Sequence, residues 1–211
     1  MGIVRNASNG LKKAVLGIAG VTLVAAGGMA EAAEWLVRAG AHTVEPKSGN
    51  HAVVHVDAGR SLTFNVTYRY AEHWGVEVLA AVPFSHDIRL NADGSKVGET
   101  RHLPPTVSLQ YHFAPQAKIR PYAGVGVNGT IFFDERTTGA LAGTDLSLGT
   151  SFGPAAQLGV DFAVNDDWFV NVDARWIDID SDARLSGAGI GTVQIDPYAF
   201  GLSIGRRFGN K

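Results

Sequence analysis

The chain has 211 residues, of which 45% are hydrophobic and 18% charged, with a formal net charge of −2 at pH 7. It contains no cysteine, which excludes a disulfide scaffold, a thiolate zinc site and a cysteine nucleophile. The near-neutral charge argues against a strongly basic nucleic-acid binder, and the hydrophobic content argues against wholesale disorder.

The first 30 residues are organised like a secretory signal peptide. Three basic residues precede the apolar run 14–27, and a small-residue cleavage site ends at Ala30. The run is shorter than the roughly 20 residues that a spanning helix needs. We therefore expect residues 1–30 to be removed and residues 31–211 to form one exported domain. Cleavage within Ala30-Glu31-Ala32 is an alternative.

Beyond residue 33 the recurring pattern is alternation with period two, which indicates β-strands. The clearest example is SLTFNVTYRY at 61–70, in which apolar side chains fall on one face and mostly polar side chains on the other. The predicted strands are 34–44, 61–70, 74–86, 105–113, 119–133, 152–164, 168–177 and 196–208. Most are longer than the usual 5–6 residues of soluble strands, and about 9–11 residues cross a bilayer obliquely.

The second face of these strands indicates which side is enclosed. It is rich in Gly, Ser, Thr, Asn and Gln and holds only scattered charges. Small residues suit the crowded lumen of an eight-stranded barrel, so we expect the apolar face to contact lipid. Aromatic residues also gather near both ends of the strands, as they do at headgroup depth.

The connections alternate strictly between short and long, as in outer-membrane barrels with short periplasmic turns. The short links are 71–73, 114–118 and 165–167, and the long links are 45–60, 87–102, 134–150 and 180–193. The sequence therefore predicts an all-β fold, an eight-stranded antiparallel transmembrane β-barrel in the outer membrane of a Gram-negative bacterium. Its last strand must pair with its first, because hydrocarbon tolerates no open sheet edge. A soluble lipocalin-like barrel is the alternative.

Several segments carry a family resemblance in the correct order. They are EWLVRAG (34–40), GVEVLAAVPFSH (75–86), HLPPT (102–106), RPYAGVGVN (120–128), DLSL (145–148), DWFVNVDARWIDID (167–180) and DPYAFGLSIGRRF (196–208). Together they resemble the OmpW family, which includes AlkL-like barrels, over residues 31 to 208. The resemblance implies a lumen that passes small hydrophobic molecules inward and releases them through a lateral opening. Arg206 departs from the family, because it falls on the lipid face near the C-terminus.

The resemblance also implies a hydrophobic constriction in the lumen, where Leu79 matches the leucine of the family's GVELL-type motif. The family's aromatic partner aligns with Arg175 or Trp176, and alternation points Arg175 inward and Trp176 outward. Together with Leu79, the charged side chains of Glu77, Asp173 and Arg175 would block an aqueous channel and favour lateral escape. In the alternative interpretation, Leu79 only packs against other side chains in the lumen.

Three prolines, Pro83, Pro104 and Pro105, lie near the outer ends of neighbouring predicted strands. Proline cannot donate a hydrogen bond to a strand ladder. An unpaired interval there would form a lateral opening. The alternative is that these prolines only mark where strand pairing ends.

Further charged residues share the inward parity and must be paired if they are buried. They are Arg38, Arg69, Arg120, Asp161, Asp173 and Arg207. We interpret them as a structural lattice rather than an acid–base catalytic pair. The protein is not expected to be an enzyme, because no outward histidine has an adjacent strand serine.

No metal site and no cofactor is expected. His51 and His55 have the i, i+4 spacing of helical metal ligands, but they lie in a glycine-rich loop. The acidic run Asp178, Asp180 and Asp182 enters the last long loop. It would bridge divalent cations at a lipopolysaccharide surface, although solvated loop acids are the simpler interpretation.

The leading functional expectation is passive uptake of small hydrophobic molecules across the outer membrane. The expected partners are outer-membrane lipid, lipopolysaccharide and small hydrophobic solutes, and no nucleic acid. A non-transport barrel that serves membrane integrity, stress adaptation or phage and colicin reception remains open.

Overall fold

The computed structural model of the protein describes residues 33–47 and 51–209. The predicted signal peptide lies outside these residues. The barrel wall consists of β1 (Glu34–Glu45), β3 (Gly59–Arg69), β4 (Trp74–Ala81), β7 (Thr106–His112), β8 (Ile119–Thr137), β10 (Ser151–Ala163), β11 (Trp168–Ile177) and β14 (Tyr198–Gly209). Among the described residues, no helix is long and apolar enough to span a membrane.

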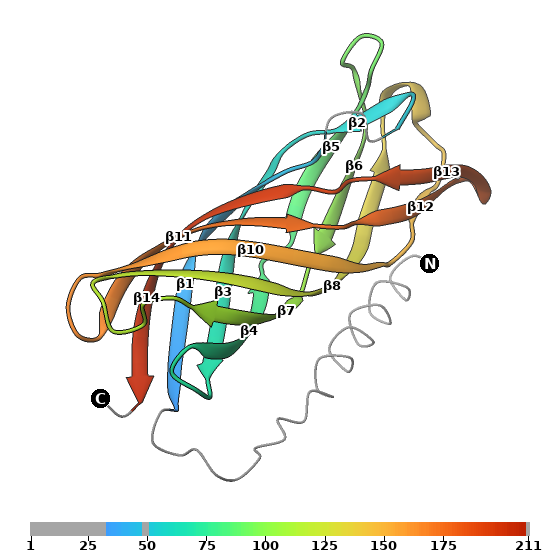
Figure 1. Cartoon of the computed structure of the whole chain (residues 1–211). Helices are drawn as coiled ribbons and strands as arrows, with labels where there is room; N and C mark the ends of the chain where they lie inside the picture. Colours follow the sequence, from blue (N-terminus) through green and yellow to red (C-terminus); the bar gives the residue numbers. More distant parts are fainter. Residues whose placement is uncertain (1–32, 48–50, 210–211) are drawn as a thin grey trace, which may run out of the picture.

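The eight strands close into an antiparallel barrel, as the sequence predicts (Figure 1). β14 pairs with β1 from Trp35 opposite Phe208 to Glu45 opposite Tyr198. β10 bridges β8 and β11, which completes the ring. Closure pairs the backbone of β1 with that of β14, so neither of these end strands leaves an open edge in the described sheet.

The wall is apolar outside and polar inside. Leu158 and Val127 are 66% and 67% exposed on the outer surface, whereas Thr63, Asn65 and Thr67 are buried in the lumen. A water-soluble barrel has the reverse arrangement, because burial of apolar side chains drives its folding. The alternation along each strand therefore produces a barrel whose outer surface suits acyl chains.

Glycines on the inward face make room for large lumen side chains. Gly159 pairs with Tyr122 across β8 and β10, and Gly205 pairs with Phe169 across β11 and β14. A Cβ at either glycine would collide with the neighbouring ring. Tyr122 and Phe169 are 1% and 0% exposed, so these rings fill the lumen above glycine backbone. Part of the glycine excess in the composition has this cause.

The long connections contain strands that the sequence analysis assigned to loops. These are β2 (Val54–Val56), β5 (Phe84–Leu90), β6 (Lys96–Leu103), β9 (Leu146–Leu148), β12 (Asp180–Leu185) and β13 (Ala188–Gln194), with a 3-10 turn at Gly139–Leu141. The single strand predicted over 74–86 is also wrong, since β4 ends at Ala81 and β5 starts at Phe84. All these strands lie at one end of the barrel, opposite the short turns (Figure 1).

The β5–β6 hairpin was missed because its outward face is charged rather than apolar. Arg89 pairs with Asp57 at 2.7 Å, and Lys96 pairs with Asp87 and Glu99 at 2.7 and 3.0 Å. Placing this many charged side chains in contact with hydrocarbon would be strongly unfavourable. The hairpin therefore stands above the bilayer on the extracellular side, where its charged face meets water and headgroups.

The extracellular strands cover an apolar core of their own. Phe132, Ile179 and Val193 belong to one buried cluster, against which Leu148 of β9 packs. A second cluster joins Val44 and Phe84 at the outer mouth of the barrel. Apolar side chains thus gather at the outer end of the lumen, in contrast to the polar barrel interior.

Candidate transport lumen

A buried group of charged side chains crosses the middle of the barrel. We call it the central lattice; it consists of Arg38, His42, Glu77, Asp161, Asp173 and Arg175. Arg38 donates from Nε and Nη2 to the two carboxylate oxygens of Asp161, at 3.2 and 2.9 Å. Its Nη1 donates to Thr67 at 2.9 Å and lies 3.5 Å from Glu77. Arg38 is 0% exposed, so every one of these contacts forms away from bulk water.

Arg175 ties the other half of the lattice together. Its Nη1 donates to Glu77 Oε1 at 2.8 Å, and its Nε donates to Asp173 Oδ2 at 2.6 Å. His42 donates from Nε2 to Asp173 at 3.1 Å, because a carboxylate only accepts, and its Nδ1 meets Thr63 at 2.7 Å. Shared partners and short distances are what a buried set of charges needs to offset desolvation.

Leu79 lies next to the lattice on the same face of β4. It is 4% exposed and points inward with Glu77, while Trp176 points outward and is 37% exposed. Leu79 and the Glu77–Arg175 pair therefore share one level of the barrel interior, whereas the side chain of Trp176 lies on the outer surface.

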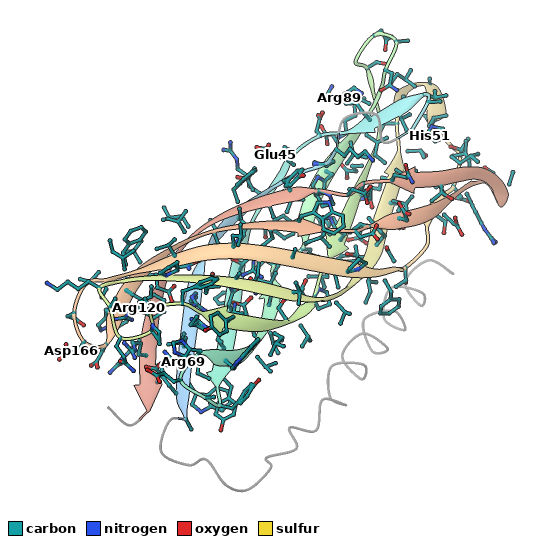
Figure 2. The ribbon with its side chains drawn as sticks, in the orientation of Figure 1. Glu45, His51, Arg69, Arg89, Arg120 and Asp166 are labelled. Carbon is teal, nitrogen blue, oxygen red and sulfur yellow. The ribbon has the colours of Figure 1, made fainter. Side chains whose placement is uncertain are left out.

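A second charged group lies at the short-turn end. Arg69 Nη1 lies 2.7 Å from Glu34 Oε2, and Arg207 donates from Nε to Glu34 Oε1. These residues line an open polar cavity of about 790 Å³, which Arg120 also lines. Figure 2 shows Arg69 and Arg120 near Asp166, at the opposite end from His51 and Arg89.

The predicted single lattice is therefore two separate groups. Arg120 lies with the second group and donates from Nε to the carbonyl of Ala117 at 2.8 Å. Glu34 and His42 were missed as members, although the parity of β1 places both on the same face as Arg38. Alternation alone would have found them.

The ladder between β4 and β7 is interrupted at the three prolines. It runs from Trp74 opposite Tyr111 to Leu79 opposite Thr106, and pairing resumes in the hairpin with Phe84 opposite His102. Between these pairs, no described residue on one side forms a ladder pair with the other side; Ala81 pairs instead with Thr63 of β3, and Leu103 with Ile131 of β8. We call this interval, residues 80–83 and 103–105, the proline seam.

The polar groups of the proline seam bond away from it. Val82 N donates to Leu62 O of β3 at 2.9 Å, and Gly129 N of β8 donates to Pro105 O at 3.0 Å. The Thr106 hydroxyl donates to Pro104 O at 3.0 Å. The two sides of the seam are therefore held by their outer neighbours rather than by each other.

An apolar cavity of about 70 Å³ lies under the extracellular strands, and its lining residue His102 directly precedes the seam in the chain. We call it the extracellular cavity. Its lining includes Val44, Phe132, Ile179, Val193, His86 and His102. The imidazoles of His86 and His102 stack with 4.9 Å between their centroids. Burial lowers the pKa of His102 to about 3, helped by the neighbouring His86, and burial also lowers the pKa of His86.

The acidic residues of the last long loop are arranged differently from the predicted run Asp178, Asp180 and Asp182. Carboxylate oxygens of Asp178, Asp180 and Asp196 lie within 4.8 Å of one another. Asp182, the third residue of the predicted acidic run, instead accepts a hydrogen bond from Thr192 at 2.9 Å. Burial and the neighbouring Asp196 raise the pKa of Asp178.

The two histidines of the glycine-rich loop have different partners. His55 donates from Nδ1 to Asn91 at 2.9 Å, and His51 Nε2 lies 3.4 Å from the carbonyl of Ile190. The i, i+4 spacing does not act as a helical ligand pair here, because His55 lies on strand β2.

The model of the OmpW family matches residues 31–208. The chain belongs to the OmpW family. Outer membrane protein W of Escherichia coli (strain K12) is 41% identical over 211 residues, covering 93% of this chain and 99% of that protein. This OmpW-family chain is therefore an outer-membrane protein of a Gram-negative bacterium.

Solved structures of similar proteins agree with the barrel. The crystal structure of the outer membrane protein OprG from Pseudomonas aeruginosa has a TM-score of 0.75 and 31% identity, covering 85% of this chain and 97% of that one. The solid-state NMR structure of AlkL in DMPC bilayers has a TM-score of 0.63 and 25% identity, covering 84% and 90%. The comparisons indicate no enzymatic family for this OmpW-family barrel.

Proposed function

We propose that this OmpW-family barrel takes up small hydrophobic molecules passively across the outer membrane and releases them sideways into the bilayer. The observation that carries the proposal is the order of three features along the barrel axis. The apolar extracellular cavity comes first, the proline seam lies below it, and the sealed central lattice follows. A solute that enters the cavity from outside would thus reach the proline seam before it reaches the central lattice.

The central lattice makes straight passage unfavourable for an apolar solute. Moving past Leu79 requires separating Arg175 from Glu77, both of which are buried. A hydrocarbon offers no hydrogen bond in return, so the separated charges would stay unpaired, at a cost of about 3–5 kcal/mol. We therefore propose that Leu79, Glu77 and Arg175 form a barrier across the lumen, so that the solute leaves sideways.

The proline seam supplies the sideways exit in this proposal. Pro83, Pro104 and Pro105 cannot donate hydrogen bonds across it, so opening it breaks no ladder pairs between its two sides. The exit leads into the lipid that covers the outward face of the wall. Outer-membrane lipid is thus the proposed acceptor, and lipopolysaccharide is the proposed neighbour of the charged β5–β6 hairpin.

Uptake in cells tests the proposal. Cells that lack the gene are supplied with the wild type, with Pro104→Val/Pro105→Val, or with the control Pro154→Val, and a hydrophobic substrate is followed into the cell. Pro154 lies in β10 opposite Val127, inside a continuous ladder. We expect the seam variant to fall toward the rate of cells without the gene and the control to keep the wild-type rate.

The same experiment separates the alternative of a non-transport barrel. The buried ion pairs of the central lattice favour this alternative, because a lumen filled by paired charges needs no transport role. Uptake rates that do not differ between cells with and without the gene would reject transport. Loop deletions that alter only surface binding, such as phage or colicin attachment, would then support a receptor or membrane-integrity role.

A further inference from the structure

We propose that the short-turn end of the barrel holds an anion site, in which Arg120 and Arg207 bind a phosphoryl group. The site is the open polar cavity of about 790 Å³ at this end. We call it the periplasmic cavity, because outer-membrane barrels turn their short connections to the periplasm. Figure 2 shows Arg120 at this end, opposite His51 and Arg89. The inference goes beyond the proposed uptake function and does not depend on it.

Three arginines and one carboxylate meet in the interior part of the periplasmic cavity. Arg69, Arg120 and Arg207 line it together with Glu34. Glu34 is shared by two of the arginines, because Arg69 Nη1 lies 2.7 Å from its Oε2 and Arg207 donates from Nε to its Oε1. Three positive charges thus face one negative charge, which leaves an excess of two positive charges in this part of the lumen.

Arg120 is the arginine that lacks a carboxylate partner. It is 7% exposed, and its Nε donates to the carbonyl of Ala117 at 2.8 Å. Asp161 lies opposite Arg120 in the β8–β10 ladder, but both of its carboxylate oxygens accept from Arg38. The charge that acts most strongly on Arg120 is Arg207, a like charge. A buried guanidinium in this position is unfavourable, so a bound anion would stabilise it.

The terminal nitrogens of Arg120 and Arg207 are accessible from the cavity. Within the described part of the chain, both side chains use Nε in their side-chain hydrogen bonds, and none of their Nη atoms is enclosed without a partner. The Arg207 side chain is 18% exposed, and both residues line the cavity. Arg69 differs, because its Nη2 donates to the carbonyl of Glu72 at 2.7 Å and its Nη1 meets Glu34. Arg69 therefore orients Glu34, whereas the other two arginines offer donors to a ligand.

The chemistry of these donors favours a phosphoryl group. A guanidinium presents a planar fork of N–H groups that matches the oxygens of phosphate and carboxylate. A carboxylate carries one negative charge, whereas a phosphate monoester carries about −1.5 to −2 at pH 7, closer to the excess of two. The cavity of about 790 Å³ compares with roughly 10–15 Å³ for one water by the same measure, so the group would enter with hydration water.

Acidic residues at the rim of the cavity do not cancel the charge inside it. Glu72 and Asp166 are exposed on the short turns, Asp167 is half-exposed, and the exposed Lys118 lies on the rim with them. Water and salt screen exposed charges over short distances, whereas buried charges are screened much less. The field inside the cavity is therefore set mainly by the three arginines and Glu34.

Inorganic phosphate is the probe for this site. Its dissociation constant is measured by NMR titration of the protein, purified from outer membranes and labelled with ¹⁵N-arginine. Maltoside micelles are used because they contain no phosphate, and sodium chloride keeps the ionic strength constant. Wild type is compared with Arg120→Gln and Arg207→Gln. Two controls remove the same charge elsewhere, Lys118→Gln on the rim and Arg206→Gln on the outer surface beside Arg207.

We expect phosphate to shift the resonances of Arg120 and Arg207 in the wild type. Each glutamine variant of these two residues should weaken binding by roughly tenfold to hundredfold, the effect of hydrogen bonds to charged groups. Lys118→Gln should weaken it by less than about threefold, because an exposed charge contributes little. Arg206→Gln should bind like the wild type. Heat-dependent migration on SDS gels verifies that each variant is folded.

Two sources can supply the phosphoryl group, free phosphate in the periplasm and the headgroup of a phospholipid at the rim. The titration is therefore repeated in phosphatidylcholine nanodiscs with and without phosphatidylglycerol. If phosphatidylglycerol shifts the resonances of Arg120 and weakens the binding of phosphate, the headgroup occupies the site. If it changes neither, the site is assigned to free phosphate. Both results support a phosphoryl site.

Three results would overturn the proposal. The first is that neither phosphate nor phosphatidylglycerol shifts the resonances of Arg120 and Arg207. The second is that Arg120→Gln and Arg207→Gln bind phosphate as tightly as the wild type. The third is an equal loss of affinity in Lys118→Gln, which would mean that phosphate responds only to the net charge of the cavity.

Discussion

Arg175 of β11 and Glu77 of β4 meet across the lumen with 2.8 Å between Nη1 and Oε1, although 98 positions separate them in the chain. Both are almost fully buried. The contact joins opposite sides of the barrel, so the wall strands are braced from within as well as by their ladders. This relationship leads to the first prediction.

Arg175→Met should lower the free energy of unfolding by about 3–5 kcal/mol, because it leaves the carboxylates of Glu77 and Asp173 without their guanidinium partner. Urea unfolding in lipid vesicles measures the change. Lys47→Met is the matched control, since the Lys47–Asp196 pair at 3.4 Å has a half-exposed lysine. The control should cost less than about 1 kcal/mol. Equal effects of the two substitutions would mean that water reaches the lattice.

Leu158→Arg should destabilise the barrel by about 2–4 kcal/mol, because it places a charge at mid-height on the lipid face. Leu158 is 66% exposed there. The comparison is Arg206→Leu, at the strand end where the Arg206 guanidinium lies over the rings of Trp168 and Phe208 at 5.5 and 4.9 Å. This second change should stay within about 1 kcal/mol. If Leu158→Arg left the free energy of unfolding unchanged, the lipid-facing orientation of Leu158 would be contradicted.

Gly205→Ala should cost about 1–3 kcal/mol through overpacking, because the new methyl group would collide with the ring of Phe169. The double variant Gly205→Ala/Phe169→Leu should recover part of the loss, since the smaller side chain vacates the space. Gly189→Ala in β13 is the control, because nothing lies within 4 Å of a Cβ there. Thermal unfolding of the purified barrel in detergent checks all three.

Acidification should destabilise the extracellular cavity through His102. In the unfolded chain this imidazole binds a proton below about its ordinary pKa of 6.5, whereas burial holds its pKa at about 3 in the folded protein. The unfolded state therefore carries more protons between these values, so stability is fully present above pH 6.5 and falls as the pH drops toward 3. The slope from one group is at most about 1.4 kcal/mol per pH unit.

The variant His102→Phe isolates this effect. Its free energy of unfolding should depend less on pH than that of the wild type between pH 6.5 and 3, with the curves parallel above pH 7. His55→Gln should follow the wild type, because His55 is part-exposed and lies outside the cavity. If the free energies of unfolding of His102→Phe and wild type changed in parallel throughout this window, the pKa of His102 would not be lowered in the folded protein.

The membrane wall could be predicted from the sequence because period-two alternation encodes two faces directly. Val127 and Asn128 follow each other in the chain and therefore point to opposite sides of the wall. The same rule placed Leu79, Glu77 and Arg175 inward. It failed for the β5–β6 hairpin, because alternation of apolar and charged residues, such as Ile88 and Arg89, also occurs in connections exposed to water.

The sequence alone determined the number of wall strands, their closure and the side that faces lipid, because these depend on local periodicity and on the need to pair every backbone group in hydrocarbon. Only the tertiary structure decided which charges meet. Arg38 bonds Asp161, which is 123 positions away, whereas Arg120 donates to the carbonyl of Ala117, three positions away. It also decided that His86 and His102 share one apolar cavity. Such contacts depend on strand register and barrel shear, which place distant residues at one level and have no local signature in the chain.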